Sequence, residues 1–202
     1  MQLNKTDIIS TERLDLILMN EAFLRACLAG EKCEAEEMSG FHIPDDWLQK
    51  RWLMEMRIKQ IQRDASSHLW LLRAIVLRSE SKMIGHIGFH AAPGGDCLKE
   101  FTPCGVELGY TVNKERRRKG FATEAILAMM RWATEKEPDA EFIVSISPDN
   151  IPSLNLANRL GFRKVGTHMD EIDGIENIFL LKKPLLNLTD WNEQQIVGEF
   201  VK

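Results

Sequence analysis

The stretch Val106–Arg131 reads VELGYTVNKERRRKGFATEAILAMMR and predicts a strand, a basic turn and a helix, in that order. Apolar and polar residues alternate as far as Val112, which is the period of a strand. Residues 113–119 are polar and basic, and from Phe121 the apolar residues recur with the period of a helix. A helix start has backbone N–H groups without acceptors in the helix and the positive end of the helix dipole. Because the run 116–119 adds four positive charges there, we expect a phosphate-bearing ligand at this turn.

The composition is that of a globular protein. The chain has 202 residues, of which 44% are hydrophobic and 28% charged, and this suits one domain with a substantial core. The formal net charge of −4 argues against a nucleic-acid partner. No apolar run approaches the roughly 18 residues of a membrane span, and the first seven residues contain no apolar signal core. We therefore expect a cytoplasmic protein without a membrane partner.

The cysteine pattern indicates reduced thiols. Cys27, Cys33, Cys97 and Cys104 form no CxxC pair, and no histidine cluster accompanies them. We expect no disulfide and no metal site, which agrees with a cytoplasmic location.

The same periods predict the remaining elements. Gly85 and Gly88 lie inside a predicted strand, where they allow a close backbone approach or a bulge. The acidic stretch 31–40 is expected to be a loop. Strands are predicted over residues 13–18, 69–77, 83–89, 106–112, 141–147, 162–168 and 175–182, and helices over 21–29, 44–63, 121–136 and 151–160.

This order of elements predicts an α/β fold with a mixed, strongly twisted sheet of about seven strands and helices on both faces. We see no linker that would split the chain, so residues 1–202 are expected to form a single domain. The segment 184–202 carries several apolar residues among polar ones. It is predicted to be a packed extension or an oligomer contact, which leaves a homodimer possible.

Three motifs resemble the GNAT superfamily of acyl-CoA-dependent N-acyltransferases. Arg117–Ala122 (RRKGFA) fits the family's Arg/Gln-x-x-Gly-x-Gly/Ala pyrophosphate signature. Ser147–Ser153 (SPDNIPS), followed by Leu160–Phe162 (LGF), looks like the second half of the family's cofactor site. Thr11–Leu14 (TERL) is typical of the branch that resembles the N-terminal acetyltransferases of ribosomal proteins. The resemblance covers about residues 8 to 183 and implies a sheet splayed at its central strands.

The resemblance implies acetyl-CoA as the cofactor. Backbone N–H groups around residues 118–122 would bind the pyrophosphate, where Gly120 permits a close approach. The pantetheine arm would pair with backbone around residues 110–112, and a main-chain N–H there would polarise the thioester carbonyl. The implied cofactor-binding residues are Tyr110, Thr111, Val112, Arg117, Arg118, Lys119, Gly120, Phe121, Ala122, Thr123, Asn150, Ser153 and Asn155.

Acyl transfer to nitrogen needs a neutral amine, and a carboxylate can accept the amine's proton directly or through a water. Glu107 is the candidate base, because it lies on the strand a few residues before the implied splay. Its alternative role is that of an exposed carboxylate or an ion-pair partner. His86 and His90 are rival bases or substrate contacts.

The leaving thiolate also needs stabilisation. Many relatives use a tyrosine where this chain has Ala157, so that acid is absent. Ser153 matches the branch that places a serine near the cofactor sulfur, although it could be an ordinary first-turn serine. Asn150 is expected to orient the pantetheine amides or the helix start, and otherwise to be an N-cap.

The resemblance therefore implies an N-acetyltransferase that acts by direct attack in a ternary complex. The acceptor is a primary amine, either a protein or peptide α-amine or a small-molecule amine. The alternative is a non-catalytic acyl-CoA-binding or regulatory module of the same fold.

Overall fold

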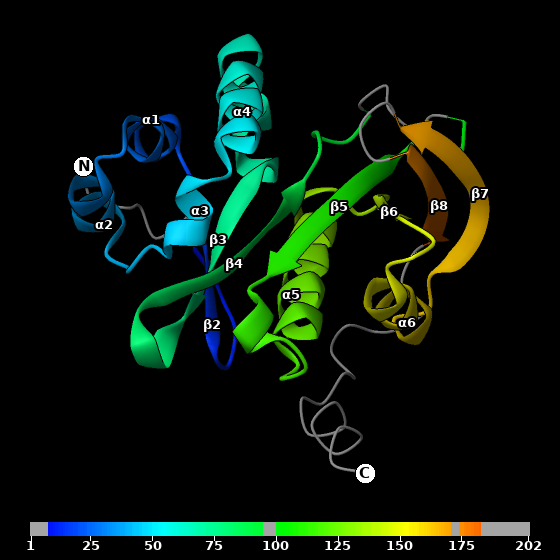
Figure 1. Cartoon of the computed structure of the whole chain (residues 1–202). Coiled ribbons are helices and arrows are strands. Elements are labelled where there is room, and N and C mark those ends of the chain that lie inside the picture. Colours follow the sequence, from blue (N-terminus) through cyan, green and yellow to red (C-terminus); the bar gives the residue numbers. More distant parts are fainter. Residues whose placement is uncertain (1–7, 95–99, 171–173, 183–202) are drawn as a thin grey trace. The chain divides into compact units, whose positions relative to one another are not determined.

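Figure 1 shows the computed structural model, which describes residues 8–94, 100–170 and 174–182. The strands are β1 Ile8–Ser10, β2 Leu14–Leu18, β3 Leu72–Leu77, β4 Lys82–Phe89, β5 Gly105–Val112, β6 Glu141–Ile146, β7 Arg163–Asp170 and β8 Gly174–Leu181. The α-helices are α1 Glu21–Ala29, α2 Lys32–Ser39, α3 Asp45–Leu48, α4 Arg51–Arg63, α5 Phe121–Lys136 and α6 Ile151–Arg159. Short 3₁₀ helices are η2 Ala65–Trp70, η3 Arg78–Glu80 and η4 Lys114–Arg116.

The eight described strands form a mixed sheet in the order β1-β2-β3-β4-β5-β6-β8-β7. The chain groups into two compact units. The first unit comprises Met1–Gly88 and Tyr110–Met129, and the second comprises Phe89–Gly109 and Met130–Lys202. Since β4, β5 and α5 each run from one unit into the other, no single linker divides the chain.

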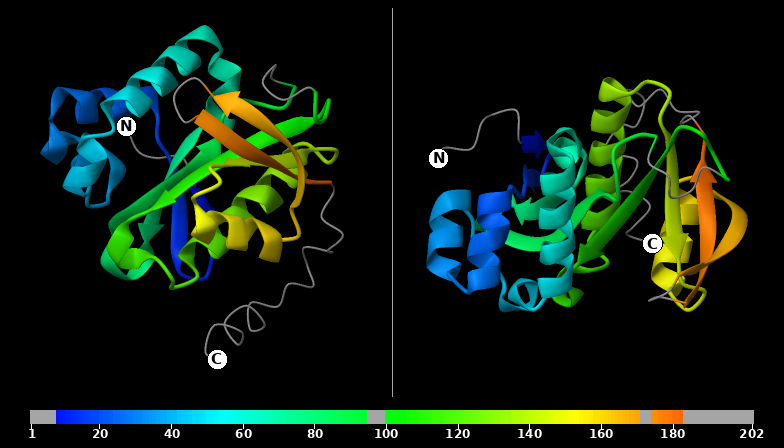
Figure 2. Two further views of the ribbon diagram at one scale, coloured as in Figure 1. Left: turned by 45° about the vertical axis from the view of Figure 1, so that its right-hand side comes forward. Right: turned by 90° about the horizontal axis from the view of Figure 1, so that it is seen from above.

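The core of the first unit is formed on the antiparallel strands β1 to β4, which are neighbours in the sheet. Neighbouring strands bring Leu16 opposite Ile75 and Ile17 opposite Ala74. All four side chains are buried, so both faces of these strands are covered. Helix α1 packs against α2 and α4 (Figure 2). One core cluster joins these helices to the strands, and it includes Ile17, Phe23, Leu24, Trp47, Met54, Leu72, Ala74 and Met83.

Two glycines allow backbone segments of the first unit to meet. A Cβ on Gly85 would overlap the carbonyl oxygen of Thr111, and one on Gly88 would overlap the carbonyl oxygen of Leu71. The register between β3 and β4 also shifts beside Gly85. The predicted close approach and the predicted irregularity are both confirmed.

The second unit contains a parallel and two antiparallel strand pairs. Strand β5 pairs with β6 in parallel over Gly105–Glu107, and β6 and β7 both pair with β8 antiparallel. Ile143, Ile178 and Leu180 form a buried cluster against which Phe101 packs. Helix α6 follows β6 and begins after Asn150, whose side chain accepts a hydrogen bond from the Ser153 N–H.

Two helices were predicted with the bounds that the structure gives, namely 21–29 and 121–136. Other predictions were wrong. Residues 32–39 form α2 rather than a loop, and the predicted helix 44–63 is divided into α3 and α4. Helix α2 escaped prediction because Ala35 is its one buried apolar side chain, which leaves no visible helical period. The first part of the predicted strand 69–77 belongs to η2, and β1 raises the strand number from seven to eight.

The contact at Gly85 gives a stability prediction. Gly85→Ala should lower the free energy of unfolding by about 2 kcal/mol or more, because the new methyl group forces β4 away from Thr111. Urea unfolding measures the change, with Ser79→Ala at an exposed position as the control. An unchanged midpoint for Gly85→Ala would contradict the close approach.

Candidate active site

The turn between β5 and α5 lies in the first unit. Helix α5 begins at Phe121, and the Glu124 N–H donates to the Gly120 carbonyl at 3.0 Å. The N–H groups of residues 121–123 therefore precede the first intrahelical bond and have no acceptor within the helix. Arg118 and Gly120 have left-handed φ values of +61° and +81°. Such conformations turn successive N–H groups toward one side, as in anion-binding loops. The left-handed residues and the helix start make this turn a candidate phosphate site.

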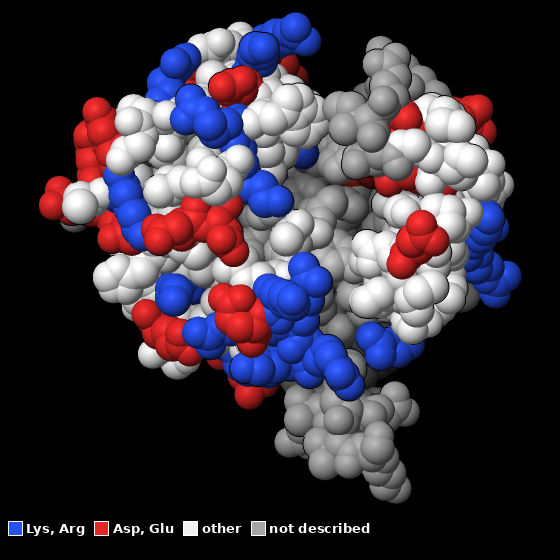
Figure 3. Space-filling model, in the orientation of Figure 1, with Lys and Arg blue, Asp and Glu red and all other residues white. Residues whose placement is uncertain are grey.

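Two of the four basic side chains of this turn bind other parts of the protein, and the other two are exposed. Both guanidinium NH₂ groups of Arg116 donate to the Glu80 carboxylate at 2.7 Å. The Nε of Arg117 donates to the Val112 carbonyl at 2.9 Å and so ties the turn to the end of β5. Arg118 and Lys119 have exposed side chains. Figure 3 shows Lys and Arg gathered, with acidic residues among them, where Figure 1 places this turn. The local field is positive on an acidic protein.

The first unit brings most of the predicted cofactor residues into one continuous stretch. Tyr110 and Thr111 are half-buried, whereas Val112 is buried. Phe121 and Thr123 are also buried, so the backbone of the first α5 turn is better placed for a ligand than those two side chains. The predicted contacts of Tyr110, Thr111, Val112, Arg117, Arg118, Lys119, Gly120, Phe121, Ala122 and Thr123 with the cofactor stay predictions.

In the second unit, Glu107 contacts two polar side chains. Its Oε1 accepts from the Ser145 hydroxyl at 2.5 Å, and its Oε2 lies 3.1 Å from His90 Nδ1. The His90 backbone N–H also donates to the Glu107 carbonyl at 2.8 Å. The His90 ring lies over Gly109, since a Cβ there would come within 2.7 Å of Nε2. The carboxylate is thus largely buried, at 11% exposed, while His90 is 44% exposed.

The environment keeps Glu107 ionised. Burial raises the pKa of its carboxyl, but the hydrogen bond and charge of His90 and the Ser145 hydroxyl outweigh burial, and the net pKa is lowered. A carboxylate with a lowered pKa is a weak acceptor for an amine proton. It is well suited to hold an imidazole by its Nδ1–H.

The rival histidine, His86, lies in the first unit. Its ring meets that of Trp47, with centroids 5.4 Å apart. Burial, followed by the charges of Lys50 and Arg57, lowers the pKa of His86 to about 4. A group that takes up a proton only at such low pH makes a poor base for an amine near neutrality. The structure therefore favours His90 over His86 as a candidate base.

The start of α6 carries the remaining predicted residues, all in the second unit. Asn150 is the N-cap, since its Oδ1 accepts from the Ser153 N–H at 3.3 Å, as the alternative interpretation expected. Ser153 is half-buried, and Asn155 is exposed. Ala157 is buried, so the side chain at the position of the usual tyrosine packs in the core. Contacts of Asn150, Ser153 and Asn155 with a cofactor stay predictions.

Sequence reasoning missed three residues that contact these sites. Ser145 holds Glu107, and Arg13 with Glu124 holds the β5–α5 turn. Ser145 occupies the polar phase of a predicted strand, which gives no hint of its partner. Arg13 belongs to the TERL motif, which was noted for its resemblance and not for a contact.

Comparison with known proteins settles the family. Residues 21–163 match the family model described as the acetyltransferase (GNAT) domain. This chain belongs to the GNAT acetyltransferase family. The match includes the β5–α5 turn and the start of α6, and it confirms the resemblance drawn from the motifs.

Individual relatives are more distant. The uncharacterized N-acetyltransferase YnaD of Bacillus subtilis is 30% identical over 92 residues, which is 46% of this chain and 49% of that protein. The chain thus matches about half the length of this curated relative. A putative ribosomal-protein-serine acetyltransferase from Vibrio cholerae has TM-score 0.59 and 16% identity, over 90% of this chain and 99% of that chain. The microcin C7 self-immunity acetyltransferase MccE, solved with acetyl-CoA and AMP, has TM-score 0.59 and 16% identity, over 90% and 98%. These structures show that the fold is the GNAT α/β fold.

Other sites were sought in the part of the chain that the structure describes. No group of three or more His, Cys, Asp or Glu residues there is arranged to hold a metal ion. No described helix is both long and apolar enough to cross a membrane. Cys27, Cys33 and Cys104 are free thiols, and Cys97 lies outside the described residues.

The lowered pKa of Glu107 predicts a pH dependence of stability. Because the folded pKa lies below the unfolded value of about 4.3, the stabilisation is complete above that pH and is lost as pH falls through the folded pKa. The free energy of unfolding of wild type should therefore exceed that of Glu107→Gln at pH 7, and this difference should shrink below about pH 4.

Urea unfolding at a series of pH values measures this difference. Glu135→Gln, at an exposed position of α5, is the matched control and should show little difference at any pH. A Glu107 difference that stays constant from pH 7 to pH 3 would show that the charge of Glu107 contributes nothing.

Proposed function

We propose that the protein is an N-acetyltransferase that moves the acetyl group of acetyl-CoA to a primary amine by direct attack in a ternary complex. Family membership supports acetyl transfer, and relatives named as N-acetyltransferases support nitrogen as the acceptor. The observation that carries the proposal is the pair Glu107 and His90: the imidazole of His90, just after the end of β4, lies 3.1 Å from the carboxylate of Glu107 on β5. The free thiols are consistent with the predicted cytoplasmic location.

Acetyl-CoA fits the residues present. Its pyrophosphate needs hydrogen-bond donors and positive charge, and the β5–α5 turn supplies helix-start N–H groups, Gly120, Arg118 and Lys119. The neighbour MccE was solved with acetyl-CoA, which supports the same cosubstrate here. When bound, acetyl-CoA supplies a thioester carbonyl and a thiol leaving group.

The side chains of the second unit would then manage the proton. The amine nitrogen bonds to the carbonyl carbon, the carbon–sulfur bond breaks, and the nitrogen loses one proton. His90 accepts that proton, directly or through a water, and Glu107 stabilises the imidazolium through its contact with Nδ1. Ser145 fixes the Glu107 carboxylate. This revises the prediction of Glu107 as the base, and it leaves Ser153 as the proposed hydrogen-bond donor to the leaving sulfur.

The acceptor is proposed as a class. A protein or peptide α-amine is supported by the likeness to a putative ribosomal-protein-serine acetyltransferase. A small-molecule amine is the second acceptor class in the proposal. The predicted role of residues 184–202 in a homodimer lies outside the described residues.

A panel of amines tests the function. Purified protein with acetyl-CoA should release thiol with peptides that begin with serine or alanine, or with polyamines, amino acids or aminoglycosides. Mass spectrometry should find one acetyl group on the accepted amine. Acetyl-CoA binding without turnover on any amine would favour the binding-module alternative, and no binding would overturn the proposal.

The proposed roles of the pair predict an order of effects. With the best acceptor, His90→Gln should lower kcat by about 100-fold, because the proton acceptor is lost. Glu107→Gln should lower kcat by about tenfold, because the amide oxygen still accepts from Nδ1–H but lacks the charge. The KM for acetyl-CoA should stay within about twofold in both.

His42→Gln, at an exposed histidine of the first unit, is the control and should leave kcat unchanged. A much larger loss for Glu107→Gln than for His90→Gln would identify the carboxylate as the base and reject the assignment to His90.

A further inference from the structure

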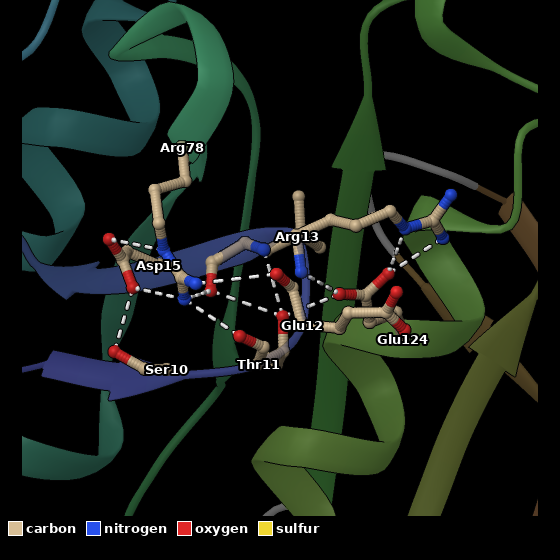
Figure 4. Close-up of polar contacts among 8 residues, drawn as sticks. Ser10, Thr11, Glu12, Arg13, Asp15, Arg78 and Glu124 are labelled. Atoms are coloured by element: carbon tan, nitrogen blue, oxygen red, sulfur yellow. Dashed lines mark hydrogen bonds and ion pairs between the residues drawn. The ribbon is translucent and has the colours of Figure 1, made fainter. Parts of the chain in front are cut away.

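The turn between β1 and β2 is joined to α5 by a dense group of polar contacts in the first unit (Figure 4). The Arg13 side chain reaches Glu124 Oε2 through Nε at 2.7 Å and Nη2 at 2.6 Å. The Arg13 backbone N–H and the Thr11 hydroxyl donate to Glu124 Oε1 at 2.9 and 2.5 Å. Glu124 is therefore saturated with donors, and its side chain is 15% exposed. This geometry locks the Arg13 guanidinium in place.

The locked guanidinium also contacts the β5–α5 turn. Its Nη1 donates to the Lys119 carbonyl at 3.0 Å. Its Cζ lies 4.6 Å from the centre of the Phe121 ring, in cation–π contact. Between these two residues, a Cβ on Gly120 would come within 3.2 Å of Nη2. One side chain thus touches three successive residues of the turn.

The bond to Lys119 fixes the direction of a donor. A trans peptide is planar, so its carbonyl and its N–H point in opposite directions. Because Arg13 holds the Lys119 carbonyl, the N–H of Gly120 in the same peptide points away from Arg13. The Gly120 carbonyl is in turn held by the Glu124 N–H. Both peptide planes that flank Gly120 are therefore restrained.

The charges give Arg13 a second effect. Its positive charge is balanced by Glu124, so Arg13 is poorly suited to be a direct phosphate ligand. Without Arg13, the Glu124 carboxylate would stand unneutralised in the first turn of α5, where it would repel an anion. Arg13 thus restrains the backbone of the turn through the Lys119 carbonyl, and it neutralises the Glu124 carboxylate, which would otherwise repel a phosphate group.

We propose that Arg13, clamped by Glu124 and Thr11, is a positioning residue that presets the Lys119–Phe121 backbone to receive the pyrophosphate of acetyl-CoA. The inference rests on the proposed function and adds a role for the TERL segment. Arg13 acts through the turn and does not take part in acyl transfer.

The chain offers a matched control in Arg78. Its Nη2 donates to the Thr11 carbonyl at 2.7 Å and pairs with Asp15 at 3.0 Å, so it braces the same β1–β2 turn. The hydrogen bonds of its side chain reach residues 11–15 and not residues 117–121, while its charge also interacts with that of Glu124. Arg78→Gln should therefore reproduce a loss of stability without a loss of pyrophosphate binding.

The test compares two ligands, CoA and S-acetylpantetheine, of which the second lacks the pyrophosphate and the nucleotide. NMR titration gives the Kd of each for wild type and for Arg13→Gln, Glu124→Gln and Arg78→Gln. Arg13→Gln should raise the Kd of CoA by about tenfold and leave that of S-acetylpantetheine within about twofold. Glu124→Gln loosens the clamp but also removes a negative charge near the anion, so it should raise the Kd of CoA by a smaller factor of about threefold. Arg78→Gln should change neither Kd. Arg13→Lys keeps the charge without the planar fork, so it should raise the Kd of CoA by about threefold.

The outcomes separate the two proposals. If wild type binds CoA and the Arg13 and Glu124 variants bind it equally well, the positioning role is overturned but the proposed function is not. Equal weakening of both ligands would mean a merely structural role and would also overturn it. Wild type that does not bind CoA would overturn the proposed function and this inference together. A melting temperature for each variant shows whether it is folded. If Arg13→Gln does not fold, Arg13→Lys or Glu124→Gln takes its place in the test.

Discussion

A helix start leaves backbone N–H groups without acceptors, and the first unit is built around this constraint at α5. Three contacts restrain the turn before α5, and their partners belong to three different parts of the first unit. Arg117 ties the turn to the end of β5, the Lys119 carbonyl is held by Arg13, and Arg116 is held by Glu80. These bonds engage carbonyls and side chains around the turn, and none of them uses the first N–H groups of α5, which are the proposed ligand donors. A site whose donors are restrained before binding loses little freedom on binding, and this favours affinity.

In the second unit, hydrogen bonds likewise restrain a functional group before any ligand binds, and here the group is the carboxylate of Glu107. A largely buried carboxylate is costly unless it is hydrogen-bonded, and Glu107 meets this demand through Ser145 and His90. The bonds that keep Glu107 ionised also make it a weak base. They orient the imidazole beside Gly109, where a side chain would displace it. For this reason the proposed base is the more exposed His90 and not Glu107.

Much of the fold could be predicted because its long elements carry clear periods. Helix α5 buries Ala125, Ile126, Met129 and Met130 on one face, and its bounds were predicted correctly. Helix α2 and strand β1 were missed, because α2 has few apolar residues and β1 has three residues. Such elements form because neighbours cover them, which a local pattern does not reveal.

The site could be predicted as motifs but not as contacts. The RRKGFA motif located the turn, and Glu107 was identified from its place on the strand. Its contact with Ser145 joins residues 38 apart, and the bond of Arg13 to Glu124 joins residues 111 apart. A single sequence, read without the structure, contains no signal that pairs residues so far apart along the chain. The same applies to the base, since periodicity alone left Glu107, His86 and His90 open.

We propose that the backbone of the β5–α5 turn binds the pyrophosphate of acetyl-CoA. The most direct test is a ¹⁵N–¹H NMR titration of the labelled protein with CoA. We expect the amide signals of Gly120, Phe121 and Ala122 to shift most, and inorganic pyrophosphate to move the same signals in the same direction. Saturable CoA binding that leaves these three amides unmoved would contradict it.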